Sequence, residues 1–229
     1  MYPYLFDIEV VRMYDIIGLL GYGLLIGYFL INRKRLYFTA DSPKWWHIAL
    51  LLAVQVVAYT FAGENLALLV GRGTEFFAFV TVSALGMALT AAVLGHRPLR
   101  WLDATVPLYL TMASVLKLSC FCGGCCNGLA WQWGLYNNST HRTEFPIQLA
   151  EAAAYALLLW LFCGYRRREG QRFALFLAAY AAVRFGVQFF RTDVAVFTPF
   201  HWMSAVFAAV GVAMWLLCRF AAKKEQCST

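Results

Sequence analysis

Apolar runs close to 20 residues long recur along this sequence, and they constrain the fold more than any other feature. A run of that length spans the hydrocarbon core of a bilayer as an α-helix. No hydrophilic block between the runs is long enough for a soluble domain. With 62% hydrophobic and 14% charged residues among 229, the chain carries more apolar surface than a soluble domain needs. We therefore predict an all-α, polytopic membrane protein with a single membrane domain over residues 1–229.

About seven transmembrane helices joined by short loops are expected. Their approximate ranges are 16–32, 46–62, 76–95, 104–121, 147–164, 173–190 and 197–219. The first 15 residues carry three acidic side chains and a single arginine, unlike the basic start of a cleavable signal peptide. The first apolar run is therefore expected to remain as a helix.

Basic residues predict the orientation of the chain. Thirteen of the 19 Lys and Arg residues follow the first, third, fifth or seventh predicted span, whereas four lie on the opposite side and two fall inside spans. Because basic residues concentrate in cytoplasmic loops, the N-terminus is expected outside the cytoplasm and the C-terminus inside. The same distribution explains the net charge of +7, so nucleic acid is not an expected partner.

Lys117 and Arg184 lie inside predicted spans, where an ionisable group costs several kcal/mol unless it is paired or faces water. Lys117 can instead extend to the membrane interface, and Arg184 can form a buried pair with Glu151 or Glu64. If both cations face one cavity near the outer leaflet, they form a receptor for phosphate, and lipid headgroups are the nearest phosphates.

Other polar residues recur at helical spacing around these cations. Tyr180, Arg184 and Gln188 are four residues apart and form one stripe, which must face protein or water rather than lipid. Gln148 and Glu151 lie three residues apart on one face at the start of the fifth span.

Four of the seven cysteines lie in the segment 120–126, CFCGGCC, at the expected outer end of the fourth span. The glycines there break the helix and permit tight turns. Cys122 and Cys125 have the spacing of a redox pair, a structural disulfide is a second interpretation, and small apolar fillers of the turn are a third. No His-rich or second paired cysteine element follows at zinc-finger spacing, so neither a metal site nor a cofactor is expected.

Taken in order, these segments resemble the prolipoprotein diacylglyceryl transferase family of bacterial inner-membrane enzymes. Tyr22-Gly-Leu24 in the first span is similar to the family's Tyr-Gly-Leu. Pro146, Gln148 and Glu151 are similar to its Pro-x-Gln-x-x-Glu element.

The resemblance continues through the second half of the chain. Tyr180, Arg184 and the Phe189-Phe-Arg191 run, with Asp193 beyond, are similar to the signature Tyr-x-x-x-Arg followed by Glu-Phe-Phe-Arg. The segment 120–128 is similar to a variant of the central Gly-Arg-x-Gly-Asn region that occurs in cysteine-rich members.

The chain departs from the family pattern at several positions. Thr81 falls about where the histidine of the family's His-Gly-Gly motif belongs. At four further positions this chain has another residue than the family: Lys117 where the family has Arg, Cys120 where it has Asn, Ala150 where it has Tyr, and Gln188 where it has Glu.

The resemblance implies a multi-pass inner-membrane transferase that moves a diacylglyceryl group from phosphatidylglycerol to the thiol of a lipobox cysteine at the outer face. Its implied partners are phosphatidylglycerol, prolipoprotein signal peptides and membrane lipid. The implied catalytic residues are Arg184, Lys117, Tyr180 and Glu151. The expected substrate contacts are Tyr22, Gln148, Gln188, Arg191, Cys120, Gly124, Asn127, Gly128 and His201.

Some alternatives stay open at this level. The acceptor of the thiol proton can be Tyr180, Glu151, His141 or His201. A membrane thiol-disulfide oxidoreductase using Cys122 and Cys125 is one rival function. A non-catalytic lipid-binding relative, favoured by the missing histidine, is another.

Overall fold

The computed structural model of the chain describes residues 45–61, 75–138, 140–163, 165, 169–191 and 199–227, together with isolated positions between 16 and 27. Most of the first expected span lies outside the described residues, as do Tyr22, Leu24, Glu64 and Asp193.

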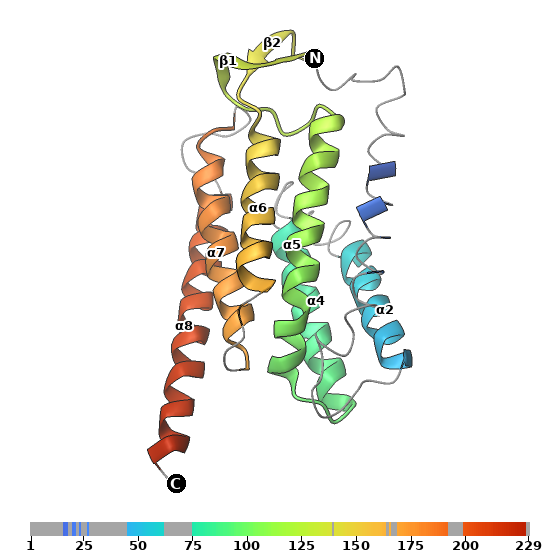
Figure 1. The fold of residues 1–229 in the computed structure, drawn as a ribbon, viewed down its shortest axis with the longest axis vertical. Coiled ribbons are helices and arrows are strands. Elements are labelled where there is room, and N and C mark those ends of the chain that lie inside the picture. The colour runs from blue at the N-terminus through green and yellow to red at the C-terminus, as the bar shows by residue number, and fades with distance from the viewer. Residues whose placement is uncertain are drawn as a thin grey trace. The chain divides into compact units, whose positions relative to one another are not determined.

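Six helices make up most of the described chain (Figure 1). They are α2 (Trp45–Phe61), α4 (Glu75–Val93), α5 (Pro98–Cys122), α6 (Ile147–Cys163), α7 (Gln171–Gln188) and α8 (Pro199–Cys227). The expectation of a mostly helical fold is confirmed for these residues. Helix α5 begins several residues before the predicted span, at Pro98, because a proline fits the first turn of a helix. Helix α8 continues past residue 219 through Ala, Lys and Glu, which are good helix formers.

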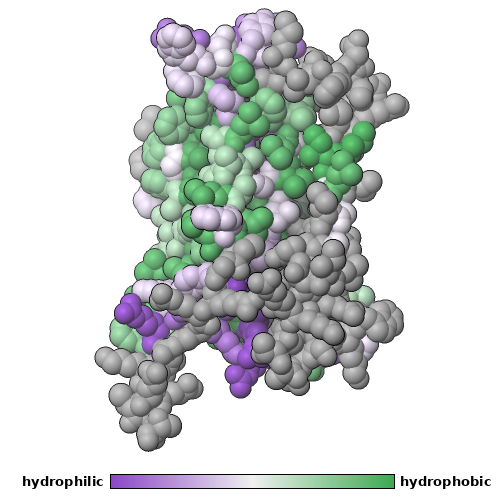
Figure 2. Space-filling view, in the orientation of Figure 1, coloured by the Kyte–Doolittle hydropathy of each residue, from purple (hydrophilic) through white to green (hydrophobic). Residues whose placement is uncertain are grey.

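Three of the described helices are long and apolar enough to cross a membrane. These segments are Phe76–Val93, Pro98–Cys122 and Pro199–Phe220, and Ile147–Phe162 is an apolar but shorter helix. Large apolar side chains on these helices are exposed, as at Leu89, Trp160 and Trp202, and green hydrophobic residues dominate much of the described face in Figure 2. Such a surface suits contact with lipid.

The chain divides into two compact units. Unit 1 comprises residues 1–28, 107–164 and 179–208, and unit 2 comprises residues 29–106, 165–178 and 209–229. Helices α5, α7 and α8 contribute to both units.

Polar contacts join helices within unit 2. Ser83 on α4 donates a 2.6 Å hydrogen bond to Gln55 on α2. The carboxylate of Asp103 on α5 accepts hydrogen bonds from the backbone N–H groups of Gly170 and Phe173, at 2.7 and 2.8 Å. Asp103 therefore satisfies N–H groups at the start of α7 that the helix itself leaves without acceptors.

Unit 1 contains a small β-hairpin in addition to helices, at the end where α5 finishes and α6 begins (Figure 1). Strand β1 (Ala130–Asn137) pairs antiparallel with β2 (Arg142–Glu144), with an irregularity between Ala130 and Leu135. A backbone hydrogen bond from Phe145 N–H to the Leu129 carbonyl, 2.9 Å, continues the pairing beyond the two strands. Leu129 N–H in turn donates to the carbonyl of Phe190, just after α7, at 3.0 Å. The all-α expectation did not include these strands.

Candidate functional site

Three ionisable side chains from three helices of unit 1 contact one another: two cations bind the same carboxylate. Glu151 on α6 is fully buried, and its Oε2 lies 2.5 Å from Nζ of Lys117 on α5. Its other oxygen, Oε1, accepts a hydrogen bond from Nη1 of Arg184 on α7. The two cations therefore share a single environment. Of the two partners expected for Arg184, Glu151 is the one that the structure shows, and it also contacts Lys117.

The positions of these residues in their helices explain the convergence. Lys117 and Arg184 lie about one turn before the ends of α5 and α7, whereas Glu151 lies about one turn after the start of α6. Since α5 runs into the hairpin and α6 runs out of it, all three turns lie at the same end of unit 1 (Figure 1). Ser114 reinforces the contact between α5 and α6 by donating a 2.6 Å hydrogen bond to the Ala152 carbonyl.

The cluster has one anion and two cations, so it carries a net positive charge. Burying charges costs several kcal/mol per ion, and mutual attraction offsets that cost only with good geometry. The side chains of Lys117 and Arg184 are 14% and 7% exposed, so an entering anion meets charges that water screens only weakly.

Two stacked tyrosines lie one helical turn further from the hairpin. The rings of Tyr180 on α7 and Tyr155 on α6 have centroids 5.2 Å apart, and both side chains are buried. Tyr155 was absent from the expected site. Its spacing of four residues from Glu151 places it on the same helix face, which was the available signal.

Several buried polar atoms of unit 1 have no hydrogen-bond partner among the described residues. They include both amide atoms of Gln188, Oε1 of Gln148 and the hydroxyls of Ser119 and Ser204. The amide nitrogen of Gln148 donates a 2.7 Å hydrogen bond to the Cys125 carbonyl. Because unsatisfied buried polar groups are rare and cost about 1–3 kcal/mol each, they indicate a place for a polar ligand or water.

His201, at the start of α8, is buried against aromatic rings. Its ring centroid lies 4.6 Å from that of Phe189 and 5.2 Å from that of Phe185. The Arg184 guanidinium carbon lies 5.8 Å from the centre of the Phe200 ring on the same helix as His201. In contrast, His141 is exposed in the hairpin turn with a positive φ of 53°.

The turn that connects α5 to the hairpin contains several of the residues expected to contact substrate. Asn127 accepts a 3.1 Å hydrogen bond from Asn137 of β1, and Gly128 forms a bridge with Arg191. A Cβ added to Gly128 would lie 2.1 Å from the Phe145 carbonyl oxygen, so only glycine fits. These residues thus have a structural role in joining the turn to the hairpin and the end of α7.

Glu144, which no motif in the sequence marks, organises the hairpin itself. Its carboxylate accepts hydrogen bonds from Thr140 and Arg142, both 2.6 Å, and from Asn137, 3.1 Å. Burial alone would raise the pKa of Glu144, but these three hydrogen bonds outweigh it and hold the pKa below its usual range.

Cys120, Cys125 and Cys126 bring their sulfurs together beside the turn, and all three are free thiols. Cys122 is not part of this group, which disfavours its pairing with Cys125. Hydrogen bonds from Cys120 and Cys125 lower the pKa of Cys126, and attraction to Lys117 and Arg191 adds to the effect. The pKa of Cys125 is raised to about 11: the hydrogen bond with Cys120 lowers it, but the interaction with Cys126 and burial together outweigh that.

Thr81 stands where the family histidine is expected, on α4 in unit 2. Its hydroxyl donates a 2.8 Å hydrogen bond to the Phe77 carbonyl of the same helix. A threonine bonded in this way supplies no general base.

These features define a helical membrane protein with a buried, positively charged polar cluster at one end of a helical unit. The profile of the family described as prolipoprotein diacylglyceryl transferase matches residues 3–217. The chain belongs to this family.

Two relatives show how distant the similarity is. A phosphatidylglycerol–prolipoprotein diacylglyceryl transferase of Dehalococcoides mccartyi is 26% identical over 140 residues, which cover 56% of this chain and 53% of that protein. The protein of the same name from Clostridium tetani is 21% identical over 251 aligned positions, which cover 96% of this chain and 99% of that protein. The chain thus matches about half the length of the first relative and nearly all of the second.

Proposed function

We propose that this chain is a phosphatidylglycerol–prolipoprotein diacylglyceryl transferase that acts at the outer face of the bacterial inner membrane. Family membership and the names of its relatives support the reaction class. The observation that carries the proposal to this chain is the convergence of Lys117 and Arg184 on Glu151. We also propose that the chain forms a single membrane domain of seven transmembrane helices with its N-terminus outside the cytoplasm.

In the proposed reaction, the thiol of a lipobox cysteine attacks the glyceryl carbon that bears the phosphate. A sulfur–carbon bond forms, the carbon–oxygen bond breaks, and glycerol phosphate leaves with the bonding electron pair. Arg184 and Lys117 stabilise the departing anion, and they do so strongly because water is largely excluded from the site. The thiol proton passes to a base. Of the three buried candidates, Glu151 is engaged by the two cations, which leaves Tyr180 and His201.

Glu151 acts in this proposal as a positioning residue. Its two oxygens are engaged by the two cations, so it holds both in place before the lipid arrives. Both amide atoms of Gln188 lack a partner among the described residues, so the nitrogen can donate to a phosphate oxygen of the lipid and the oxygen can accept from a glycerol hydroxyl.

The test is transfer in membranes supplied with phosphatidylglycerol and a lipobox peptide. Removing one donor of this kind costs roughly 100- to 1000-fold in rate, so Arg184→Ala should lose transfer by at least that factor. Because this change also leaves Glu151 with one partner fewer, Arg184→Lys serves as a second variant that keeps the charge. Arg97→Ala is the matched control, since the ion pair that Arg97 forms among the described residues of unit 2 is exposed.

Rates in Arg184→Ala close to those of the control would remove the anion site from the mechanism. A non-catalytic lipid-binding relative is the second candidate, favoured by the helix-bonded Thr81 at the family histidine position. Binding of phosphatidylglycerol to the unaltered chain without any transfer, in membranes where a related transferase is active, would establish that alternative.

A further inference from the structure

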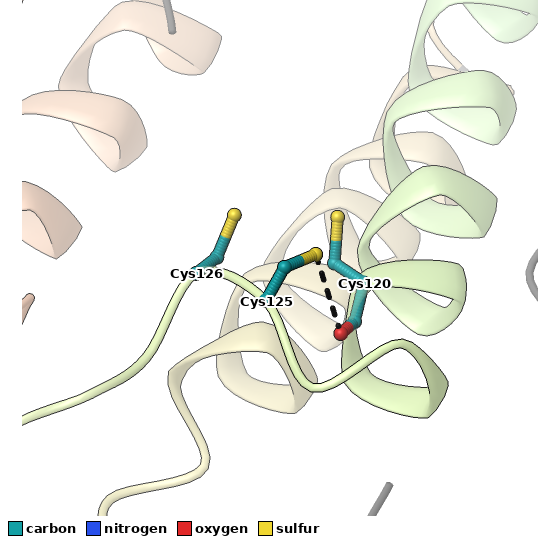
Figure 3. A group of neighbouring side chains, drawn as sticks. All are labelled: Cys120, Cys125 and Cys126. Carbon is teal, nitrogen blue, oxygen red and sulfur yellow. Dashed lines mark hydrogen bonds between the residues drawn. The ribbon is translucent and has the colours of Figure 1, made fainter. Parts of the chain in front are cut away.

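Three cysteine sulfurs lie close together at the end of α5, although the sequence contains no second cysteine pair at zinc-finger spacing. The Sγ atoms of Cys120, Cys125 and Cys126 all lie within 4.8 Å of one another. Figure 3 shows Cys120 on the last turn of the helix, with Cys125 and Cys126 on the turn that follows it and the Cys125 sulfur directed toward Cys120.

Backbone hydrogen bonds fix the turn that brings these sulfurs together. The N–H groups of Gly123 and Cys125 donate to the carbonyls of Ser119 and Cys120, at 2.8 and 3.1 Å. Gly124 has a φ of 62°, which glycine adopts freely, but Cys126 has a φ of 60°, which is unfavourable for a residue with a Cβ. Such backbone conformations persist where the surrounding structure requires them, and they occur often at ligand-binding sites.

The spacing of the sulfurs suits a shared metal ion. A metal–thiolate bond of about 2.3 Å places the sulfurs of a three- or four-coordinate ion roughly 4 Å apart. Sulfurs within 4.8 Å therefore need to move by less than about 1 Å. The positive charges of Lys117 and Arg191 act on Cys126, so they offset the repulsion among thiolates.

We propose that Cys120, Cys125 and Cys126 form a binding site for one thiophilic metal ion, with Cu(I) as the cation that fits best. No histidine or carboxylate joins the three sulfurs in the described part of the chain, whereas structural zinc sites usually have four protein ligands. Soft thiolate ligands favour Cu(I). On binding, each thiol releases its proton to solvent, three sulfur–metal bonds form, and the ion stays monovalent. This metal site goes beyond the transferase reaction proposed above, and its test measures metal binding rather than lipid transfer.

The experiment is an anaerobic titration of the reduced, purified full chain with Cu(I), in competition with a chromophoric Cu(I) chelator. We expect the chain to take one high-affinity Cu(I) ion and X-ray absorption to count about three sulfur ligands near 2.3 Å. Loss of a partner in the outer shell of a metal site costs 10- to 100-fold in affinity, so replacing a direct ligand in Cys126→Ser or Cys120→Ser should weaken binding by at least about 100-fold.

Cys122→Ser and Cys218→Ser are the matched controls, because both are free cysteines outside the three-sulfur group. Both should keep the affinity of the unaltered chain. Equal weakening in a control and in Cys126→Ser would overturn the proposed ligand set. Tighter binding of Zn²⁺ than of Cu(I) would overturn the copper assignment, and a disulfide among the three cysteines in chain isolated without reductant would favour a redox pair instead.

Discussion

At the scale of single residues, the sequence identified the central charges of the candidate site because such groups are costly in an apolar helix. Lys117 and Arg184 stood out for this reason, and their convergence on Glu151 agrees with the requirement that they share one environment. The sequence could not choose between Glu151 and Glu64 as a partner, since that choice depends on how α6 and α7 pack.

Other residues of the site were not predictable by the same argument. Tyr155 is an ordinary aromatic residue in an apolar helix, and only its packing on Tyr180 brings it into the site. Gln188 was expected to contact substrate, and the structure adds that both of its amide atoms are buried without a partner among the described residues. Because the Gln188 amide has no partner in the described chain, its replacement tests a role in binding substrate.

We predict that Gln188→Met lowers the transfer rate by about 10-fold or more without lowering stability. The change removes two buried polar atoms that gain no hydrogen bond within the described chain, so folding loses little or nothing. Gln148→Met is the comparison for stability, because it removes the 2.7 Å hydrogen bond to the Cys125 carbonyl and should destabilise the protein by about 1 kcal/mol.

Lipid transfer and thermal unfolding in the same membrane mimetic measure the two effects. Retained transfer in Gln188→Met, combined with a larger loss of stability than in Gln148→Met, would assign Gln188 a structural role only.

At the scale of secondary structure, apolar run length located the described helices well because a helix satisfies its own backbone in lipid. The ends of α2, α6 and α7 lie within about two residues of the expected bounds. The hairpin was missed because β2 has only three residues and its pairing depends on Glu144, which bonds to groups brought near it by the turn.

The pKa of Glu144 makes the hairpin sensitive to acid. Since its folded pKa lies below the ordinary value of 4.5, the stabilisation is fully present above about pH 4.5 and is lost as the pH falls through the folded pKa. We predict faster hydrogen exchange in residues 130–144 at about pH 3 than at about pH 6, after correction for intrinsic exchange rates, with little change in α6.

Glu144→Gln should abolish most of this pH dependence, because the amide does not titrate. Its hairpin should exchange faster than that of the unaltered chain already at about pH 6, since an amide accepts weaker hydrogen bonds than a carboxylate from Arg142. An unchanged pH dependence in this variant would show that another group controls the hairpin.

At the scale of the whole molecule, the apolar composition and the charge distribution make separate predictions. Composition requires a membrane protein, and the described helices include three that can cross a bilayer. Orientation depends instead on the 13 basic residues that follow the odd-numbered spans against four on the other side. The number of spans and their orientation stay predictions, because the basic loops after the first and fifth spans lie largely outside the described residues.

The orientation can be tested with two reporters whose activity depends on the compartment. A fluorescent protein fused after Thr229 should fold and fluoresce, because the basic residues after the last span keep this end in the cytoplasm. Alkaline phosphatase inserted in the hairpin turn at Asn138 should be active, because it needs the oxidising compartment outside to form its disulfides. Exchanging the two positions should silence both reporters. Active phosphatase at the C-terminus would reverse the assignment and would place the Glu151 cluster at the cytoplasmic face, where the outer-leaflet mechanism fails.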